Sequence, residues 1–372
     1  MERKEHLTDV RRLVVKIGTR LVAKGTQAPD LEFLDQLARQ LAELRERGLQ
    51  TVLVVSGAVH LGRRALGLRG TLKELSLRQA AAAVGQPELL HLYLEALSAH
   101  GLLAAQILLT AEDMADRARY LNARNTVEAL LKQQAVPVIN ENDSVSVEGV
   151  TFGENDRLAA IVAAGIHADG LFLLSDQAGV HTADPRKDEQ AKMIWEVPPD
   201  GDILHHGEAA GGTESRGGMR AKISAAQMAR DCGLATFIAD GAEENVVLRL
   251  LAGERLGTFF LPGERRRGSD VWIATAVARG QLIVDEGAQR ALGDPDGASL
   301  LPVGIVQVEG EFHAGDVVEV LGPEGQAIAQ GIVNYSAADI RKIKGLQSRD
   351  VRRILGRLGP KEVIHRDYMV VT

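Results

Sequence analysis

Short apolar runs alternate with amphipathic segments from the start of the chain to residue 239, and this alternation restricts the folds that the chain can adopt. Residues 13–17 and 50–55 are apolar and rich in β-branched side chains, which favour strands. Between them, leucines recur every three or four residues through 31–44, which is the spacing of one helix face. Asp30 is suited to begin that helix and Gly48 to end it. We therefore expect a strand, a helix and a strand in this order.

The same alternation continues along the chain. Further apolar runs lie at 102–109, 136–139, 171–174 and 234–239, and further helical segments near 87–100, 122–135, 156–168 and 219–232. This order is typical of an α/β fold, with an open and mainly parallel sheet covered by helices on both faces. Ligands of such sheets bind beyond the carboxyl ends of the strands. The residues that follow each apolar run are therefore the candidates for chemistry.

A second, smaller domain is expected because 372 residues exceed what one hydrophobic core usually organises. The segment 261–270 combines proline, glycine and clustered charge, and the pattern after it changes to short strands separated by glycine-rich turns. We predict an α/β domain at 1–262, a linker at 263–272 and a small, mostly-β domain at 273–372.

Composition and charge exclude several classes of protein. The formal net charge of −7 argues against nucleic acid as the main partner of the whole chain. The chain has no uninterrupted apolar stretch of about 20 residues and no secretory signal at its start, so we expect a cytoplasmic protein without a membrane partner. Cys232 is the only cysteine, which excludes an internal disulfide and any multi-thiolate metal site. We predict no bound metal in the protein itself.

Two glycine-containing motifs have the character of phosphate sites. Lys16 ends the first predicted strand, and Gly18 after it lets the backbone approach a ligand closely. Gly217 and Gly218 lead into an amphipathic helix whose first turn contains Lys222, and a helix N-terminus attracts anions. Taken alone, Lys16 is more simply explained as a solvent-exposed lysine at a strand end.

Small or polar residues follow the other predicted strands and open one helix. Ordinary turn chemistry or helix capping is the alternative interpretation for each of them. They are Ser56-Gly57-Ala58, Asn140-Glu141-Asn142-Asp143, Asn155-Asp156 and Ser175-Asp176. The chain contains no Gly-Lys dipeptide, and no GxGxxG opens a helix after a strand. A nucleotide, if bound, must therefore use a cradle other than a Walker A loop or a Rossmann turn.

The order and spacing of these motifs resemble those of the amino acid kinase family, and most closely its branch that phosphorylates free glutamate. The resemblance rests on Val-Val-Lys16-Ile-Gly-Thr, Ser56-Gly-Ala, Asn-Glu-Asn-Asp143, Asn155-Asp156, Ser175-Asp176, Thr-Ala-Asp-Pro-Arg186 and Gly-Gly-Met-x-x-Lys222. The region from about residue 273, including Val-Asp-Glu-Gly-Ala at 284–288, resembles a PUA domain.

The resemblance implies an enzyme that uses ATP with Mg²⁺ to phosphorylate the side-chain carboxylate of L-glutamate. The product would be L-glutamyl 5-phosphate, at the first step of proline biosynthesis. The resemblance also implies a homo-oligomer, either a dimer or a tetramer, and proline as a candidate feedback inhibitor.

The family's functional residues carry over to matching positions. Catalysis is expected of Lys16, Lys222 and Asp156, with the carboxylate holding both lysines in place. Glutamate is expected to bind Ser56, Asp143 and Asn155. ATP is expected to bind Lys16, Ser175, Asp176, Arg216, Gly217, Gly218, Met219, Arg220, Ala221 and Lys222. Many members read Thr-Gly-Gly-Met-x-Thr-Lys, whereas Arg216 and Ala221 stand here at the two threonine positions.

Two alternatives remain open. One is another carboxylate kinase of the same family, acting on acetylglutamate, aspartate, carbamate or a nucleoside monophosphate. The other is RNA binding through the PUA-like domain, because residues 341–357 are rich in basic side chains. These are Arg341, Lys342, Lys344, Arg349, Arg352, Arg353 and Arg357, against the single acid Asp350. A solvated helix face is the simpler explanation of such a run.

Overall fold

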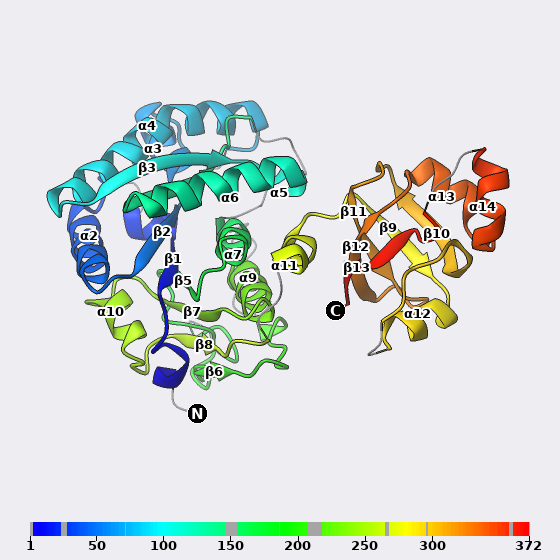
Figure 1. Cartoon of the computed structure of the whole chain (residues 1–372). Coiled ribbons are helices and arrows are strands. Elements are labelled where there is room, and N and C mark those ends of the chain that lie inside the picture. The colour runs from blue at the N-terminus through cyan, green and yellow to red at the C-terminus, as the bar shows by residue number, and fades with distance from the viewer. Residues whose placement is uncertain are drawn as a thin grey trace. The chain divides into compact units, whose positions relative to one another are not determined.

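The computed structural model describes residues 3–23, 28–70, 72–145, 155–185, 187–206, 218–264, 268–294, 297–356 and 360–371. The chain divides into two compact units, an N-terminal unit at Met1–Arg266 and a C-terminal unit at Arg267–Thr372 (Figure 1). The division falls within the segment 263–272, which the sequence predicts to be a linker.

An eight-stranded sheet forms the centre of the N-terminal unit, in the order β3-β4-β2-β1-β5-β7-β8-β6. The strands are β1 (Arg12–Ile17), β2 (Gln50–Val55), β3 (Leu103–Leu109), β4 (Ala135–Glu141), β5 (Gly170–Ser175), β6 (Glu196–Val197), β7 (Ala235–Asp240) and β8 (Thr258–Phe260). Every neighbouring pair is parallel except β7 and β8, which are antiparallel. The predicted α/β fold with a mainly parallel sheet is confirmed.

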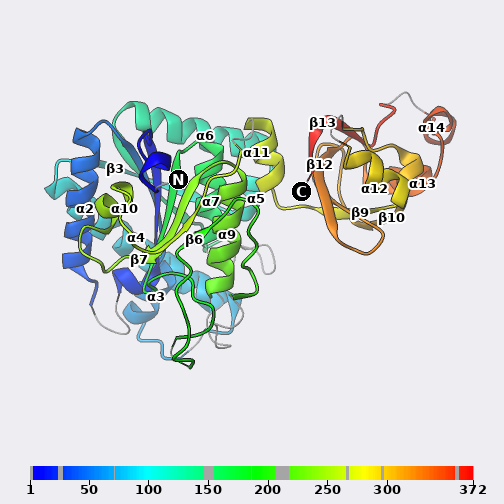
Figure 2. The ribbon, with the colours of Figure 1, turned by 90° about the horizontal axis from the view of Figure 1, so that it is seen from below.

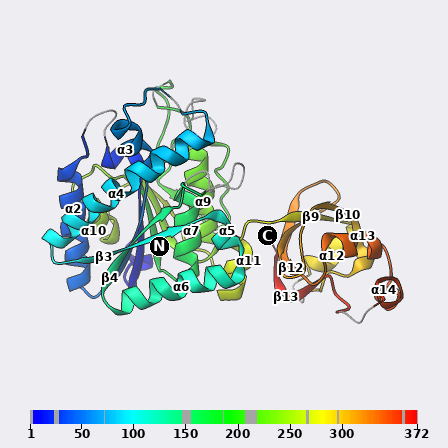
Figure 3. The same ribbon diagram turned by 90° about the horizontal axis from the view of Figure 1, so that it is seen from above.

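Helices cover both faces of this sheet. They are α1 (Thr19–Val22), α2 (Leu31–Glu46), α3 (Ala58–Ala65), α4 (Leu75–Ala99), α5 (Ala111–Ala115), α6 (Arg117–Lys132), α7 (Asn155–Gly165), α9 (Met219–Asp231) and α10 (Val246–Leu251), with a 3₁₀ turn at Arg3–His6. Figures 2 and 3 show α2 and α10 on one side of the strands and α7 and α9 on the other.

The central strand β1 divides its side chains between the two faces. Val15 and Ile17 belong to the buried cluster that α2, α4 and α10 complete. Successive side chains of a strand point to opposite faces, so Lys16 lies on the face of α7 and α9. Lys16 pairs in register with Val54 of β2 and Leu173 of β5, which places it in the middle of the sheet.

The helix predicted between the first two strands is present as α2, with the expected ends. Asp30 accepts a hydrogen bond from the backbone N–H of Phe33 at 3.0 Å, which caps the first turn. Gly48 follows the helix with φ +82°, a conformation that glycine adopts without strain. Both predicted helix signals are confirmed.

The start of α4 was predicted wrongly. The sequence suggested a helix from residue 87, but α4 begins at Leu75 and continues through Pro87. Proline removes one helical hydrogen bond, yet α4 continues through Pro87 and packs closely against α3. A Cβ atom on Gly85 would lie 1.9 Å from the carbonyl oxygen of Ala58, so only glycine allows the two helices to approach this closely.

The C-terminal unit contains a five-stranded sheet in the order β10-β9-β11-β12-β13. Its strands are β9 (Gly280–Val284), β10 (Ile305–Gly310), β11 (Val317–Leu321), β12 (Ala327–Val333) and β13 (Ile364–Val371). Its helices are α11 (Gly268–Thr275), α12 (Glu286–Leu292), α13 (Ala337–Ile343) and α14 (Ser348–Leu355), with a 3₁₀ turn at Pro302–Gly304. A separate buried cluster fills this unit, so the predicted small, mostly-β fold is confirmed. None of the helices described in either unit is long and apolar enough to span a membrane.

Candidate active site

Two lysines from different elements hold one buried carboxylate. Asp156, in the first turn of α7, is fully inaccessible to solvent. Its Oδ1 lies 2.7 Å from Nζ of Lys16 on β1, and its Oδ2 lies 3.0 Å from Nζ of Lys222 on α9. Within this trio the formal charges sum to +1. Buried charges of this kind require close pairing, so the trio fixes both ammonium groups at the carboxyl edge of the sheet.

The neighbouring residue Asn155 ties α7 to two strands. Its side-chain Nδ2 donates to the carbonyl oxygen of Val55 at 2.6 Å, to Oγ of Ser56 at 3.0 Å and to Oδ1 of Asn140 at 2.8 Å. Oδ1 of Asn155 is buried and accepts no hydrogen bond from any residue that the structure describes. Buried acceptors are nearly always satisfied, so an unsatisfied one is suited to receive a ligand's donor.

Asp143 lies just after β4 and is partly buried. Burial raises the pKa of the Asp143 carboxyl, and the positive charge of Arg78 on α4 opposes that rise. A carboxylate held in this setting gains from a cationic ligand, because the ligand restores the interactions that desolvation removed. The ammonium group of an amino acid is such a ligand.

The carboxyl end of β5 carries the other predicted pair. The Ser175 side chain is buried, and its Oγ accepts a hydrogen bond from the backbone N–H of Gln177 at 3.3 Å. Asp176 is exposed and lies 2.7 Å from the guanidinium of Arg20 on α1. Partial burial opposes ionisation of Asp176, but the hydrogen bond and charge of Arg20 outweigh it and lower the pKa of the carboxyl.

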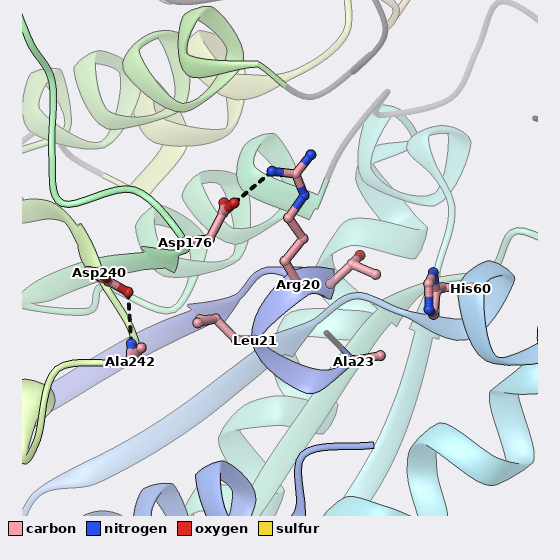
Figure 4. A pocket seen from close by; sticks show the side chains of 8 residues that line it. Arg20, Leu21, Ala23, His60, Asp176, Asp240 and Ala242 are labelled. Carbon is pink, nitrogen blue, oxygen red and sulfur yellow. Dashed lines mark hydrogen bonds and ion pairs between the residues drawn. The ribbon is translucent and has the colours of Figure 1, made fainter. Parts of the chain in front are cut away.

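A pocket of roughly 530 Å³ opens around this ion pair (Figure 4). Its lining consists of Thr19, Arg20, Leu21, Ala23, His60, Asp176, Asp240 and Ala242. A pocket of this size accommodates a small-molecule ligand. It lies after β1, β5 and β7, where ligands of parallel sheets bind.

The predicted ATP segment is described only from Gly218 onward, and Arg216 and Gly217 lie outside the described residues. Gly218 precedes α9, Met219 and Lys222 are buried, Ala221 is partly exposed and Arg220 is exposed. The backbone therefore brings a helix N-terminus to the same edge of the sheet as Lys16. Arg186, the last residue of the Thr-Ala-Asp-Pro-Arg motif, also lies outside the described residues.

Two residues that contact the predicted site belong to none of the sequence motifs. Arg20 and Gln86 appeared in none of the motifs, yet they contact Asp176 and Asn140 respectively. Asn140 was part of a noted motif but was not assigned a role. A basic residue directly after Lys16-Ile-Gly-Thr was the available signal for Arg20, whereas nothing local to the sequence distinguishes Gln86.

The described residues include no cluster of three or more His, Cys, Asp and Glu side chains placed to hold a metal ion.

In the C-terminal unit, several side chains of the basic run at 341–357 already form contacts within the unit. Arg341 pairs with Glu311 at 2.7 Å and Arg353 with Asp350 at 3.3 Å, while Lys344 donates to a backbone carbonyl. RNA binding by this run remains a prediction.

Comparison with known proteins decides the family. Residues 11–240 match the Amino acid kinase family, and residues 280–355 match the PUA domain. The chain belongs to the amino acid kinase family. The amino acid kinase match includes Lys16, Asn155, Asp156 and Lys222.

Relatives within this amino acid kinase family resemble the chain over nearly its whole length. It is 44% identical over 370 residues to a glutamate 5-kinase of Moorella thermoacetica, covering 98% of this chain and 97% of the relative. It is 44% identical over 362 residues to a glutamate 5-kinase of Thermus thermophilus, covering 97% of each chain. It is 45% identical over 372 residues to a glutamate 5-kinase of Azoarcus sp., covering 99% of this chain and all of the relative.

Proposed function

We propose that the chain is a kinase that transfers the γ-phosphoryl group of ATP to the side-chain carboxylate of L-glutamate. The buried trio of Lys16, Asp156 and Lys222 is the observation that carries this proposal. Two cations held this close together could offset the charges of an anionic acceptor and a polyphosphate, which supports the proposal. The relatives at 44–45% identity are glutamate 5-kinases, which supports glutamate as the acceptor.

The chemistry requires electrostatic positioning rather than a general base. A glutamate side chain has a reference pKa near ~4.3, so the attacking carboxylate is already ionised at neutral pH. Bringing it to about 4 Å from a phosphate charge costs roughly 4 kcal/mol per charge pair at an effective dielectric of 20. Lys16 and Lys222 offset that repulsion and stabilise the charge that spreads over the transferring phosphoryl group. Asp156 keeps both ammonium groups aimed at the same region.

The substrates divide between the two sides of the trio. On the side of β2 and β4, Ser56, Asp143 and Asn155 bind glutamate. Asp143 balances the ammonium group, and Oδ1 of Asn155 accepts one of its hydrogens. On the side of β5 and α9, ATP binds Ser175, Asp176 and the segment 216–222, with the N-terminus of α9 directed at its phosphates. Mg²⁺ enters with ATP as part of the substrate and neutralises phosphate oxygens.

The product is L-glutamyl 5-phosphate, an acyl phosphate, formed at the first step of proline biosynthesis. We further propose a cytoplasmic homo-oligomer, a dimer or tetramer, with proline as a feedback inhibitor. These proposals rest on the family.

The test is an ATP-dependent hydroxamate assay of the full chain, in which hydroxylamine traps an acyl phosphate. Free glutamate, N-acetylglutamate and aspartate are compared at equal concentration, with product formation also followed as release of ADP. Turnover with glutamate well above that with the other two supports the proposal. Preference for either competitor, or no turnover with any of them, overturns it.

A further inference from the structure

A hydrogen-bonded relay connects helix α4 to the glutamate side of the active site. Oε1 of Gln86 accepts from Nδ2 of Asn140 at 2.7 Å, and Oδ1 of Asn140 accepts from Nδ2 of Asn155 at 2.8 Å. The relay therefore runs from α4 through the end of β4 to the start of α7.

Backbone groups determine which end of each asparagine carboxamide donates and which end accepts, and Gln86 adds the contact that holds the Asn140 carboxamide in place. The backbone N–H of Glu141 can only donate, and it donates to Oδ1 of Asn140 at 2.9 Å. The carbonyl oxygen of Val55 can only accept, and it accepts from Nδ2 of Asn155 at 2.6 Å. A flipped Asn140 carboxamide would turn its Nδ2 donor toward the N–H of Glu141, and a flipped Asn155 carboxamide would turn its oxygen toward the carbonyl oxygen of Val55. Asn140 must therefore direct its Nδ2 at Gln86, and Asn155 must keep its oxygen turned away from these contacts.

This orientation leaves Oδ1 of Asn155 buried and without a hydrogen bond from the described residues. A group that satisfies it must be a donor. Among the groups of glutamate, only the α-ammonium donates hydrogen bonds, since both carboxylates accept.

Helix α4, which carries Gln86, packs closely against α3. Gly85, which precedes Gln86, meets Gly62 of α3, and a Cβ on Gly85 would lie 2.4 Å from the backbone nitrogen of Gly62. The same helix carries Arg78, whose charge acts on Asp143. Two side chains of α4 thus influence two residues proposed to bind the ammonium group.

We propose that Gln86 is a positioning residue that selects a substrate with a free α-ammonium group, by holding Asn140 and through it the carboxamide of Asn155. The inference rests on the proposed function, because it takes glutamate as the acceptor. Gln86 does not touch the reacting atoms. Its loss should weaken recognition of the ammonium group and leave phosphoryl transfer and ATP binding unchanged.

The experiment compares Gln86→Met, which keeps the side-chain volume and removes the acceptor, with Gln86→Glu, which keeps an acceptor of the same reach. Gln36→Met on α2 is the matched control, because among the described residues the Gln36 side chain hydrogen-bonds to Glu32 of the same helix and not to the relay. Each full-length variant is measured for KM and kcat with glutamate, KM for ATP, and the inhibition constant of glutarate, which lacks the ammonium group.

For Gln86→Met we expect the KM for glutamate to rise about three- to tenfold, the range of one neutral hydrogen bond. The glutarate inhibition constant, the KM for ATP and kcat should stay within about twofold, and Gln86→Glu should restore most of the glutamate affinity. Three outcomes overturn this inference and leave the proposed function standing. They are an equal loss of affinity for glutamate and glutarate in Gln86→Met, no change in the kinetics of Gln86→Met, and a folded Gln86→Glu protein that does not recover glutamate affinity. Absence of glutamate turnover in the unmodified chain instead overturns the proposed function.

Discussion

The ammonium group of Lys16 lies 2.7 Å from Oδ1 of Asp156, and neither side chain is more than 5% exposed. The second oxygen of the same carboxylate is 3.0 Å from Lys222, so one buried acid organises two cations from elements that are distant in sequence. The three residues therefore have different roles. The lysines can act on a ligand, whereas Asp156 acts through them.

Replacing Lys222 with alanine should lower turnover far more than it weakens glutamate binding. Its charge acts mainly where phosphate charge redistributes in the transition state, and loss of one such group costs about 10²–10³-fold in kcat. Steady-state kinetics with both substrates give the measurement, and we expect the KM for glutamate to stay within about threefold. If turnover is unchanged in Lys222→Ala, Lys222 has no catalytic role.

Asp156→Asn should destabilise the N-terminal unit, because two buried ammonium groups lose their shared counter-charge. Removing one partner of a buried ion pair typically costs about 3–5 kcal/mol. The measurement is urea unfolding followed by a probe in the N-terminal unit, since the two units need not unfold together. Asp200→Asn, at an exposed loop position of the same unit, is the control and should change stability by less than about 0.5 kcal/mol. Equal effects of the two substitutions contradict the role given to Asp156.

Asp143→Asn should stabilise the ligand-free protein at neutral pH and weaken glutamate binding. Because burial raises the pKa of Asp143 in the folded state, its charged form opposes folding above the pKa of the unfolded chain, near ~3.9. The gain in stability should therefore vanish as the pH falls below that value. The KM for glutamate should rise about tenfold or more, since a hydrogen bond to a charged group is lost. Thermal unfolding at several pH values and steady-state kinetics test the two parts separately.

The same carboxyl should impose a pH dependence on glutamate recognition. Only the ionised form balances the ammonium group, so the KM for glutamate should fall as the pH rises through the raised pKa of Asp143. Arg78→Gln removes the positive charge that opposes this rise and should move the acid limb of the profile to higher pH. If the acid limb of the plot of the KM for glutamate against pH does not move in Arg78→Gln, a group other than Asp143 causes the pH dependence.

Arg20→Ala should affect ATP use without a large loss of stability. Arg20 and Asp176 form an ion pair whose side chains are 66% and 38% exposed, and such pairs contribute no more than about 1 kcal/mol. Figure 4 shows the Arg20 guanidinium directed at Asp176 beside the pocket. We expect the KM for ATP to rise several-fold and that for glutamate to stay constant. Arg47→Ala, which breaks an exposed ion pair with Glu43 at the C-terminal end of α2, is the control.

Arg216 and Ala221 occupy positions where many members of the family have threonine. If Arg216 supplies a cation in place of the hydroxyl contacts, Arg216→Thr should weaken ATP use at least several-fold, because a charge-assisted hydrogen bond contributes roughly 1.5–3 kcal/mol. Kinetics of Arg216→Thr, Ala221→Thr and the double variant give the coupling between the positions. Recovery only in the double variant supports compensation, whereas independent effects reject it.

The sequence by itself determined the class of fold and the composition of the site. Alternating apolar runs and helical repeats are local signals, and they gave the parallel sheet because each strand and helix must bury one face. Residues at strand ends and at a helix entry, such as Lys16, Ser56 and Lys222, were identifiable because the carboxyl edge of a parallel sheet gathers such residues. For Asn155 and Asp156, the sequence left helix capping and a functional role equally open.

Only the tertiary structure decided which of these residues meet. Lys222 and Asp156 are 66 residues apart, Asn140 and Gln86 are 54 apart, and Arg20 and Asp176 are 156 apart. Such contacts depend on strand order, on β1 lying between β2 and β5, and on how closely a helix such as α4 packs. None of these leaves a periodic trace in the chain, because a side chain's partner across a sheet edge is set by the position of whole elements and not by its own neighbours in sequence.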